Sequence, residues 1–251
     1  MSKIFALTRI RNESEIIVDT LDHFKTFASH VVIYDDASTD NTVELCEKWH
    51  LDNPEVDMDI IENYEWSIDR ANAETTNRQE LLVLAKSLSQ SGDDWFVYMD
   101  ADERLDMDYQ VFEAEHIDAI TMRLFDFYIT EEDKDLDYTH RKFIGPEYRD
   151  ILFAYRHKVA AGFVYPDQRE CMLNPTANHV RYGFVKHYGK SFSIQQWEDT
   201  CEYYATHFPK YSAKWNARRG KAIHTESDFG YPLITWDEKV SKGISMAEAT
   251  K

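Results

Sequence analysis

The sequence has few cysteines, no long apolar run and no surplus of basic residues, and each absence excludes a class of protein. Its three cysteines, Cys46, Cys171 and Cys201, are far apart and form no CxxC pair, which argues against a disulfide framework and a cysteine-based zinc site. No run of about 18 apolar residues is present, so we expect no membrane span. The apolar stretch at the N-terminus is too short for a signal peptide, and we therefore expect a cytoplasmic protein.

The balance of charge limits the partners of the chain. Acidic residues outnumber basic ones by 46 to 28, which gives a formal net charge of -18 over 251 residues. Such a chain repels nucleic-acid phosphates and anionic lipid headgroups, so binding to either would need a strong local patch of Lys and Arg. The clearest basic stretch, Lys214 to Lys221, holds four charges and no repeat. We expect no nucleic-acid partner.

The first half of the chain alternates apolar runs with stretches of helical spacing. Four short apolar runs predict buried strands, at residues 4–7, 31–34, 57–63 and 95–99. Helical spacing predicts three helices between them, over residues 16–27, over 43–49, and from a cap at Thr75 or Thr76 to about Ser91. This alternation predicts βαβ units and a mostly parallel sheet with helices on both faces, and such sheets bind ligands beyond the carboxyl ends of their strands.

The second half of the chain is less regular. We expect a strand over residues 119–128, one or two more within 153–165, and a helix over 194–207. No linker rich in Pro, Gly or Ser interrupts the sequence, so we predict one domain, residues 1–251, with a helical elaboration at its C-terminal end. Aromatic residues between Trp197 and Trp215 more often pack a helix onto a core than stack on sugars, and we favour the core interpretation.

Asp100-Ala101-Asp102, directly after the predicted strand 95–99, is the most informative short motif. Two carboxylates on a tight turn can converge on one hard cation such as Mg²⁺ or Mn²⁺, although the same residues also suit the first turn of a helix. A calcium EF-hand loop is excluded because Arg104 and Val111 stand at its fifth and twelfth positions. A phosphatase of the haloacid-dehalogenase type fits poorly, since its nucleophilic Asp follows the first strand, but it stays an alternative.

Three stretches, in this order and spacing, resemble family 2 glycosyltransferases of the GT-A fold: residues 7–13, 31–42 and 95–103. The resemblance covers roughly residues 3–106 and is nearest to the subgroup with an Asp-Ala-Asp-Glu motif, which includes enzymes of bacterial surface polysaccharides. It implies an α/β fold with a GT-A-like, Rossmann-type mixed sheet, mostly parallel and flanked by helices. Residues 1–106 would bind a nucleotide sugar, and residues 107–251 would form the acceptor side.

The resemblance also implies roles for individual residues. Asp36 would hydrogen-bond the nucleobase, Arg9 would line the nucleotide pocket, and Asp100 would lie near the ribose, while Asp35 could equally be a turn residue. Arg70 and Arg78 would face the nucleotide, where a guanidinium can bind phosphate oxygens. The other expected nucleotide-sugar-binding positions are Thr8, Asn12, Glu13 and Ala101.

A metal site and a base complete the set of expected residues. By similarity Asp102 would ligate the metal, and His187, in Val185-Lys186-His187-Tyr188-Gly189, would close the site. Since imidazole is a better ligand for Mn²⁺ than for Mg²⁺, manganese is the first choice and magnesium the second. Glu170 is the expected base, with Asp167 as the alternative; Arg169 stands where relatives often carry His.

Together these features predict an inverting, metal-dependent glycosyltransferase. It would move a hexose or pentose from a nucleoside-diphosphate sugar to a hydroxyl of a carbohydrate acceptor, in polysaccharide or glycan assembly. The alternatives are a metal-dependent phosphatase and a non-catalytic protein that binds sugar nucleotides.

Overall fold

The computed structural model describes residues 2–164, 172–173 and 178–250, and these form two compact units. The first unit comprises Met1–Asp102, Met107–Met122 and Leu152–Gly183, and the second comprises Glu103–Asp106, Arg123–Ile151 and Phe184–Lys251. Strands β6, β7 and β10 pass from one unit into the other along the chain. The expectation of one domain over residues 1–251, divided near residue 106, stays a prediction.

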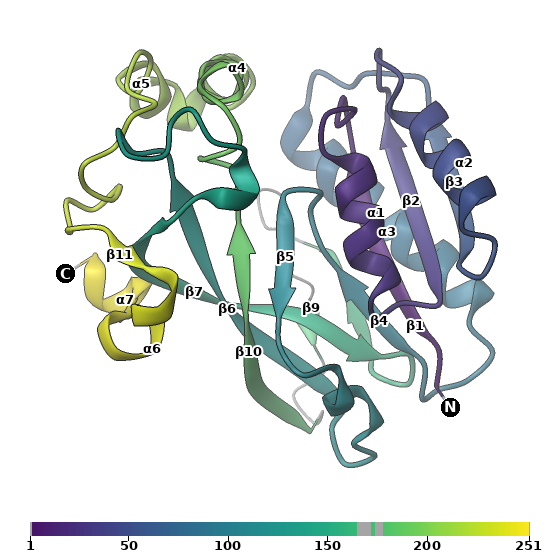
Figure 1. Cartoon of the computed structure of the whole chain (residues 1–251). Helices are drawn as coiled ribbons and strands as arrows, with labels where there is room; N and C mark the ends of the chain where they lie inside the picture. The colour runs from purple at the N-terminus through teal and green to yellow at the C-terminus, as the bar shows by residue number, and fades with distance from the viewer. Residues whose placement is uncertain (1, 165–171, 174–177, 251) are drawn as a thin grey trace. The chain divides into compact units, whose positions relative to one another are not determined.

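The first unit is an α/β layer built on four parallel strands. Their order is β3-β2-β1-β4, and the end of β7 adds an antiparallel fifth strand beside β4. The strands are β1 (Ile4–Ile10), β2 (His30–Asp36), β3 (Asp57–Asn63), β4 (Trp95–Tyr98) and β7 (Phe143–Arg156). The helices are α1 (Ile17–Lys25), α2 (Thr42–Asp52) and α3 (Arg70–Leu88). In Figure 1, α1 and α2 lie in front of this sheet and α3 behind it, as right-handed crossovers require when the strand order reverses at β4.

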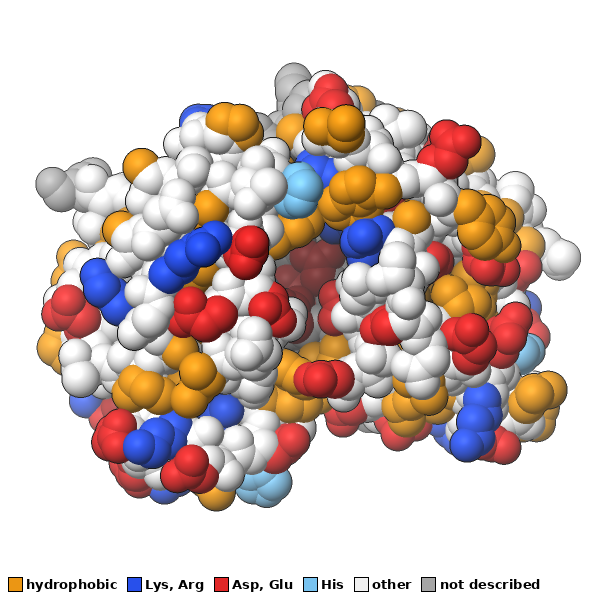
Figure 2. Space-filling view, turned by 90° about the horizontal axis from the view of Figure 1, so that it is seen from above, with side chains coloured by type: hydrophobic (Ala, Val, Ile, Leu, Met, Phe, Trp, Pro, Cys, Tyr) orange, Lys and Arg blue, Asp and Glu red, His pale blue; other side chains and the backbone are white. Residues whose placement is uncertain are grey.

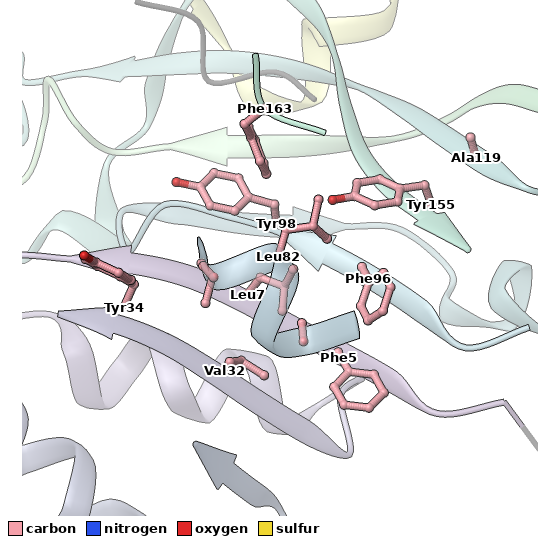
Figure 3. Packing of buried hydrophobic residues seen from close by; sticks show 12 residues of the cluster. Phe5, Leu7, Val32, Tyr34, Leu82, Phe96, Tyr98, Ala119, Tyr155 and Phe163 are labelled. Atoms are coloured by element: carbon pink, nitrogen blue, oxygen red, sulfur yellow. The ribbon is translucent and has the colours of Figure 1, made fainter. Parts of the chain in front are cut away.

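Strands β1, β2 and β4 are apolar along almost their whole length because both faces of the sheet are covered. Aromatic and aliphatic side chains of these strands pack against Leu81, Leu82 and Ala85 of α3 (Figure 3). Phe5, Leu7 and Phe96 are fully buried. Burial of each such side chain contributes about 1.5–3 kcal/mol, so this core fixes the strand register and with it the positions of the residues beyond the strand ends.

The second unit is mainly antiparallel. Its strands follow the order β7-β6-β10-β5, with β11 and β12 also paired to β7. These strands are β5 (Glu103–Asp106), β6 (Ala119–Tyr128), β10 (His179–His187), β11 (Ile234–Thr235) and β12 (Ile244–Ser245). Its α-helices are α4 (Ile194–His207), α5 (Ser212–Asn216), α6 (Lys239–Lys242) and α7 (Met246–Ala249).

Short 3-10 turns and a small hairpin complete the described elements. The turns are η1 (Tyr109–Glu113), η2 (Tyr138–His140), η3 (Pro209–Tyr211) and η4 (Trp236–Glu238). The hairpin, in the first unit, pairs β8 (Ala161–Gly162) with β9 (Met172–Leu173).

The α/β class with a mostly parallel sheet flanked by helices, predicted from the sequence, is what the first unit shows. Several boundaries differ from the predicted ones, most of all at the start of α3. Helix α3 begins at Arg70 because Asp69 caps it, whereas the hydroxyls of Thr75 and Thr76 bond to carbonyls of their own helix. Of the one or two strands expected within residues 153–165, β8 lies inside this range and β7 reaches into it from residue 143.

No helix within the described residues is long and apolar enough to cross a membrane. On the face seen in Figure 2, Lys and Arg side chains stand singly or in small groups among acidic and apolar ones. This mixed surface agrees with the excess of acidic residues in the sequence.

Candidate functional site

The candidate site lies in the first unit, where β1, β2 and β4 end beside one another. Ile10 is in register with Asp35, and the Met99 amide donates to the Leu7 carbonyl at 2.9 Å, which brings Asp100 close to the end of β1. The carboxyl ends of parallel strands form the usual ligand-binding edge of such a sheet.

Two turns at this edge have backbone conformations that side chains disfavour. Asn12 (φ 54°) and Ala37 (φ 59°) are the only non-glycine residues with positive φ in the described part of the chain. Asn tolerates this region, whereas Ala pays about 1 kcal/mol or more. The Asn12 amide donates to Ser38 Oγ at 2.9 Å, and Asn12 Oδ1 accepts the Thr39 amide at 2.7 Å, so the two turns hold each other.

A buried cluster of charges occupies the end of β2. Asp36 Oδ2 accepts Arg9 Nη1 at 2.8 Å and also accepts Arg70 Nη2. The side chains of Asp36 and Arg70 are 1% and 0% exposed, and Arg9 also lies 3.4 Å from Glu74. Burial alone would lower the pKa of Arg9, but the surrounding acidic groups, led by Glu74, outweigh burial and raise it. Arg9 therefore stays charged, and its ion pairs with Asp36 and Glu74 hold it in place.

Trp66 covers this cluster with its indole ring. The guanidinium of Arg11 lies 3.5 Å from the ring centroid and that of Arg70 lies 3.8 Å from it. Arg11 in turn donates to the carbonyls of Asp36 and Ala37. Cation–π contacts of this kind favour arginine and fix its plane.

A hydrogen-bonded chain connects α3 with the end of β4. Arg78 Nε donates to the Tyr98 hydroxyl at 2.9 Å, and that hydroxyl donates to Asp100 Oδ1 at 3.0 Å. Arg78 Nη2 also lies 3.3 Å from Glu74. Although burial alone would lower the pKa of Arg78, Tyr98 and then Asp100 raise it. Arg78 thus stays charged beside the Asp-x-Asp turn.

Carboxylates gather on the other side of Arg9. Burial, followed by the charge of Asp102, raises the pKa of Glu13 to about 8, and Asp100 acts in the same direction. Thr20 Oγ1 donates to the Ala101 carbonyl at 2.6 Å, which holds the Asp-x-Asp turn against α1. A further negative charge would be unfavourable in this environment, whereas a bound cation would stabilise the ionised carboxylates.

The chemistry of these donors fits Mg²⁺ or Mn²⁺. Both cations prefer carboxylate oxygens, and Mg²⁺ is often held by one or two carboxylates together with substrate phosphates. Across residues 2–164, 172–173 and 178–250, no three His, Cys, Asp or Glu side chains form a group that could hold an ion. The carboxylates of the Asp-x-Asp turn therefore suit a cation whose other ligands come from the substrate.

Three other expected residues have plainer surroundings. The buried hydroxyl of Thr8 has no hydrogen-bond partner among the described residues, and Ala101 is buried. Asp35 Oδ2 accepts the Ser38 amide at 3.0 Å, which is the turn geometry that we weighed against a binding role.

His187 ends β10 in the second unit, within a separate cluster of charges. Its Nδ1 lies 2.5 Å from Asp126 Oδ1, and Asp126 also bonds to Lys190 Nζ at 2.5 Å and to Arg149 at 2.8 Å. Although burial opposes the shift, Arg149 and then Lys190 hold the pKa of Asp126 well below its usual range. Glu170 and Asp167, the expected base and its alternative, lie outside the described residues.

Several residues of these clusters were not expected from the sequence. Glu74 could have been, because Arg70, Glu74 and Arg78 follow one another at the four-residue spacing of ion pairs on a helix. Trp66 and Asp126 carry no such signal, since each meets its partners only through the fold.

No family model and no curated protein matches the chain. Among solved structures, it is similar to the mannosyltransferase PcManGT from Pyrobaculum calidifontis, in complex with GDP-Man and Mn²⁺, at 16% identity and a TM-score of 0.40, over 88% of this chain and 65% of that one. It is also similar to GalNAc-T7 with UDP, GalNAc and Mn²⁺, at 12% identity and a TM-score of 0.45, over 86% of this chain and 51% of that one.

A third similar structure is a putative glucose-1-phosphate thymidylyltransferase from Bacillus anthracis, with 11% identity, a TM-score of 0.34, and coverage of 91% of this chain and 87% of that one. This chain thus spans less than two thirds of the length of each of the two glycosyltransferases.

Proposed function

We propose that the protein is an inverting glycosyltransferase that uses a nucleoside-diphosphate sugar and a divalent cation, Mn²⁺ before Mg²⁺. The observation that carries the proposal is the convergence of two fixed arginine–carboxylate groups at one strand edge. Asp36, at the end of β2, accepts hydrogen bonds from Arg9 and Arg70. Asp100, just after β4, is linked to Arg78 through the Tyr98 hydroxyl. A nucleotide presents both hydrogen-bonding groups and negative phosphates, and this edge offers carboxylates and guanidinium groups to match them.

Each residue has a proposed task at this edge. Asp36 would hydrogen-bond the nucleobase, Arg9 would line the nucleotide pocket, Arg70 and Arg78 would face the phosphates, and Asp100 would lie near the ribose. Thr8, Asn12, Glu13 and Ala101 would line the same pocket. The hydroxyl of Thr8, buried and without a partner among the described residues, is available for a ligand bond.

Asp102 would hold the cation, and a bound cation would offset the charge that develops on the leaving diphosphate. That His187 is a further ligand is an expectation from the resemblance and stays a prediction. In the reaction an acceptor hydroxyl oxygen bonds to the anomeric carbon, the bond from that carbon to the diphosphate breaks, and a base takes the hydroxyl proton. Glu170 is proposed as that base and Asp167 as the alternative. A hexosyl or pentosyl transfer in the cytoplasmic assembly of a polysaccharide or glycan is the setting that the resemblance suggests.

Thermal unfolding in the presence of nucleotide sugars, with and without Mn²⁺, tests the proposal. A ligand at 100 times its dissociation constant stabilises the folded state by about 2.7 kcal/mol, which raises the melting temperature by about 5–10 °C in a protein of this size. Asp102→Ala should abolish the part of the shift that needs Mn²⁺. Asp52→Ala, at an exposed carboxylate that ends α2, should leave it unchanged.

Four results would contradict the proposal or part of it. If no nucleotide sugar changes the melting temperature, the proposed site does not bind this class of ligand. If the Mn²⁺-dependent change is the same in Asp102→Ala, Asp102 is not a metal ligand. Release of phosphate from phosphate esters, with a phosphoenzyme on Asp100, would indicate the phosphatase instead. Donor binding without turnover, when hydroxyl acceptors are supplied, would indicate a non-catalytic sugar-nucleotide-binding protein.

A further inference from the structure

One segment of the second unit departs from the acidic character of the chain. Residues 209–221, here called the basic segment, contain five Lys and Arg side chains and no acidic one, in a chain of net charge -18. The segment includes η3, α5 and the turn that follows α5. Its basic residues are Lys210, Lys214, Arg218, Arg219 and Lys221.

Most of these cations form no ion pair with a described residue, although Glu198 accepts the Gly220 amide at 2.8 Å. Within the described residues, only Arg218 of the basic segment forms an ion pair, with Asp228 at 2.7 Å. The other four side chains belong to exposed residues. Other surface lysines have a carboxylate partner, among them the exposed Lys25, Lys142 and Lys242 and the half-exposed Lys134. The protein has more acidic than basic residues, yet four cations close together in its sequence have no ion-pair partner among the described residues. They leave a local positive field that is available to an external anion.

The aromatic rings beneath the basic segment are already engaged. Trp215 stacks on Tyr204 with centroids 4.8 Å apart and planes at 13°, and the Arg218 guanidinium lies 4.8 Å from the Trp215 ring. Trp197 packs nearby, with its indole N–H donating to the Arg218 carbonyl at 3.1 Å. Because Trp215 is used in this way, it is not an open platform for stacking nucleobases, and the segment offers charge to its surroundings rather than rings.

The spacing of the cations also restricts the ligand. They are distributed over residues 210–221, so a single phosphate would meet only some of them, whereas a layer of anionic groups could meet all of them. Repulsion from the rest of the chain is screened beyond about 8 Å at physiological ionic strength, so the basic segment can act locally despite the net charge. Lysine and arginine stems are long enough to reach headgroups without insertion of the backbone.

We propose that the basic segment docks the protein on the anionic headgroups of a membrane surface. The attachment is peripheral and electrostatic, with the ring stack of Trp197, Tyr204 and Trp215 as its rigid support. It does not depend on the proposed sugar transfer, because no residue of the basic segment has a proposed task in that reaction.

Co-sedimentation of the full chain with lipid vesicles tests this inference. We expect binding to phosphatidylcholine vesicles that contain about a third phosphatidylserine, weak binding to pure phosphatidylcholine, and loss of binding as salt is raised. Each basic residue near an anionic leaflet strengthens binding about fivefold, so changing Lys210, Lys214, Arg219 and Lys221 to Gln together should weaken it well over tenfold.

A control with the same net charge separates local from global effects. The control variant changes four ion-paired lysines to Gln together: Lys25, Lys134, Lys142 and Lys242. It has the same net charge as the basic-segment variant, but its affinity for anionic vesicles should be several-fold higher. Unaltered thermal unfolding shows that both variants are folded. Equal losses in the two variants, equal binding to neutral vesicles, or binding to heparin but not to anionic vesicles would each overturn the inference.

Discussion

The charge cluster at the end of β2 allows a quantitative prediction about stability. Asp36 serves two arginines through one oxygen, and the side chains of Asp36 and Arg70 are almost completely buried. Asp36→Asn leaves Arg9 and Arg70 facing each other without their shared anion. Removing one partner of a buried ion pair costs about 3–5 kcal/mol, a large part of the about 5–15 kcal/mol that stabilises a typical domain.

Arg70→Met should cost less, about 1–3 kcal/mol, because Asp36 keeps Arg9. In the variant that carries both changes, Asp36→Asn and Arg70→Met, Arg9 keeps its ion pair with Glu74 and no second guanidinium faces it. The loss of stability should therefore be smaller than the sum of the two single losses by about 1–3 kcal/mol.

Urea denaturation at neutral pH measures all three variants, and the Asp36→Asn midpoint in a thermal scan should fall by about 10 °C. A cost of Asp36→Asn below about 1 kcal/mol, or strict additivity in the double variant, would refute the reasoning.

Two further predictions concern His224 and Trp66. Burial lowers the pKa of His224 below 6.5, so the unfolded chain binds the proton more readily than the folded one. The stability of the fold therefore falls as the pH drops through about 6.5. His224→Gln should flatten the pH dependence of the melting temperature between about pH 7 and pH 5, and an unchanged slope would contradict this. Trp66→Ala removes two cation–π contacts and should cost about 1–3 kcal/mol in urea denaturation. Trp66→Phe keeps an aromatic face and should lose less, so equal losses in the two variants would contradict this prediction.

The parallel layer of the first unit was predictable because both faces of its strands are buried. Asp57–Asn63 and Ala119–Tyr128 match their predicted ranges, and helix α4, Ile194–His207, does as well. The start of α3 was missed because residues 70–77 are mostly polar and lack an apolar stripe, although Asp69 is a good cap. Strands β5 and β10 were missed since they are short or half-exposed.

The expected site residues differ in how far the structure brings them together. Arg9, Asp36, Arg70, Arg78 and Asp100 belong to charge clusters at the strand ends. The place of Asp36 and Asp100 followed from acidic motifs at the ends of parallel strands, whereas the three arginines were expected from the resemblance alone. Their roles toward a nucleotide sugar stay predictions. The partners of His187 were out of reach of sequence reasoning.

Those partners come from different parts of the chain. Asp126 lies 61 residues before His187 in the sequence, so no local spacing encodes their contact, and Asp126 also bonds to Arg149 and Lys190.

The way in which the chain passes back and forth between its two units has a practical consequence. Each unit is assembled from three separate stretches, so no single cut yields either of them. A fragment that ended at Asp102 would keep β4 but lose the residues 154–156 that pair with it, and the open edge would invite aggregation. Complementation between fragments is therefore a sounder route than truncation for studying one unit without the other.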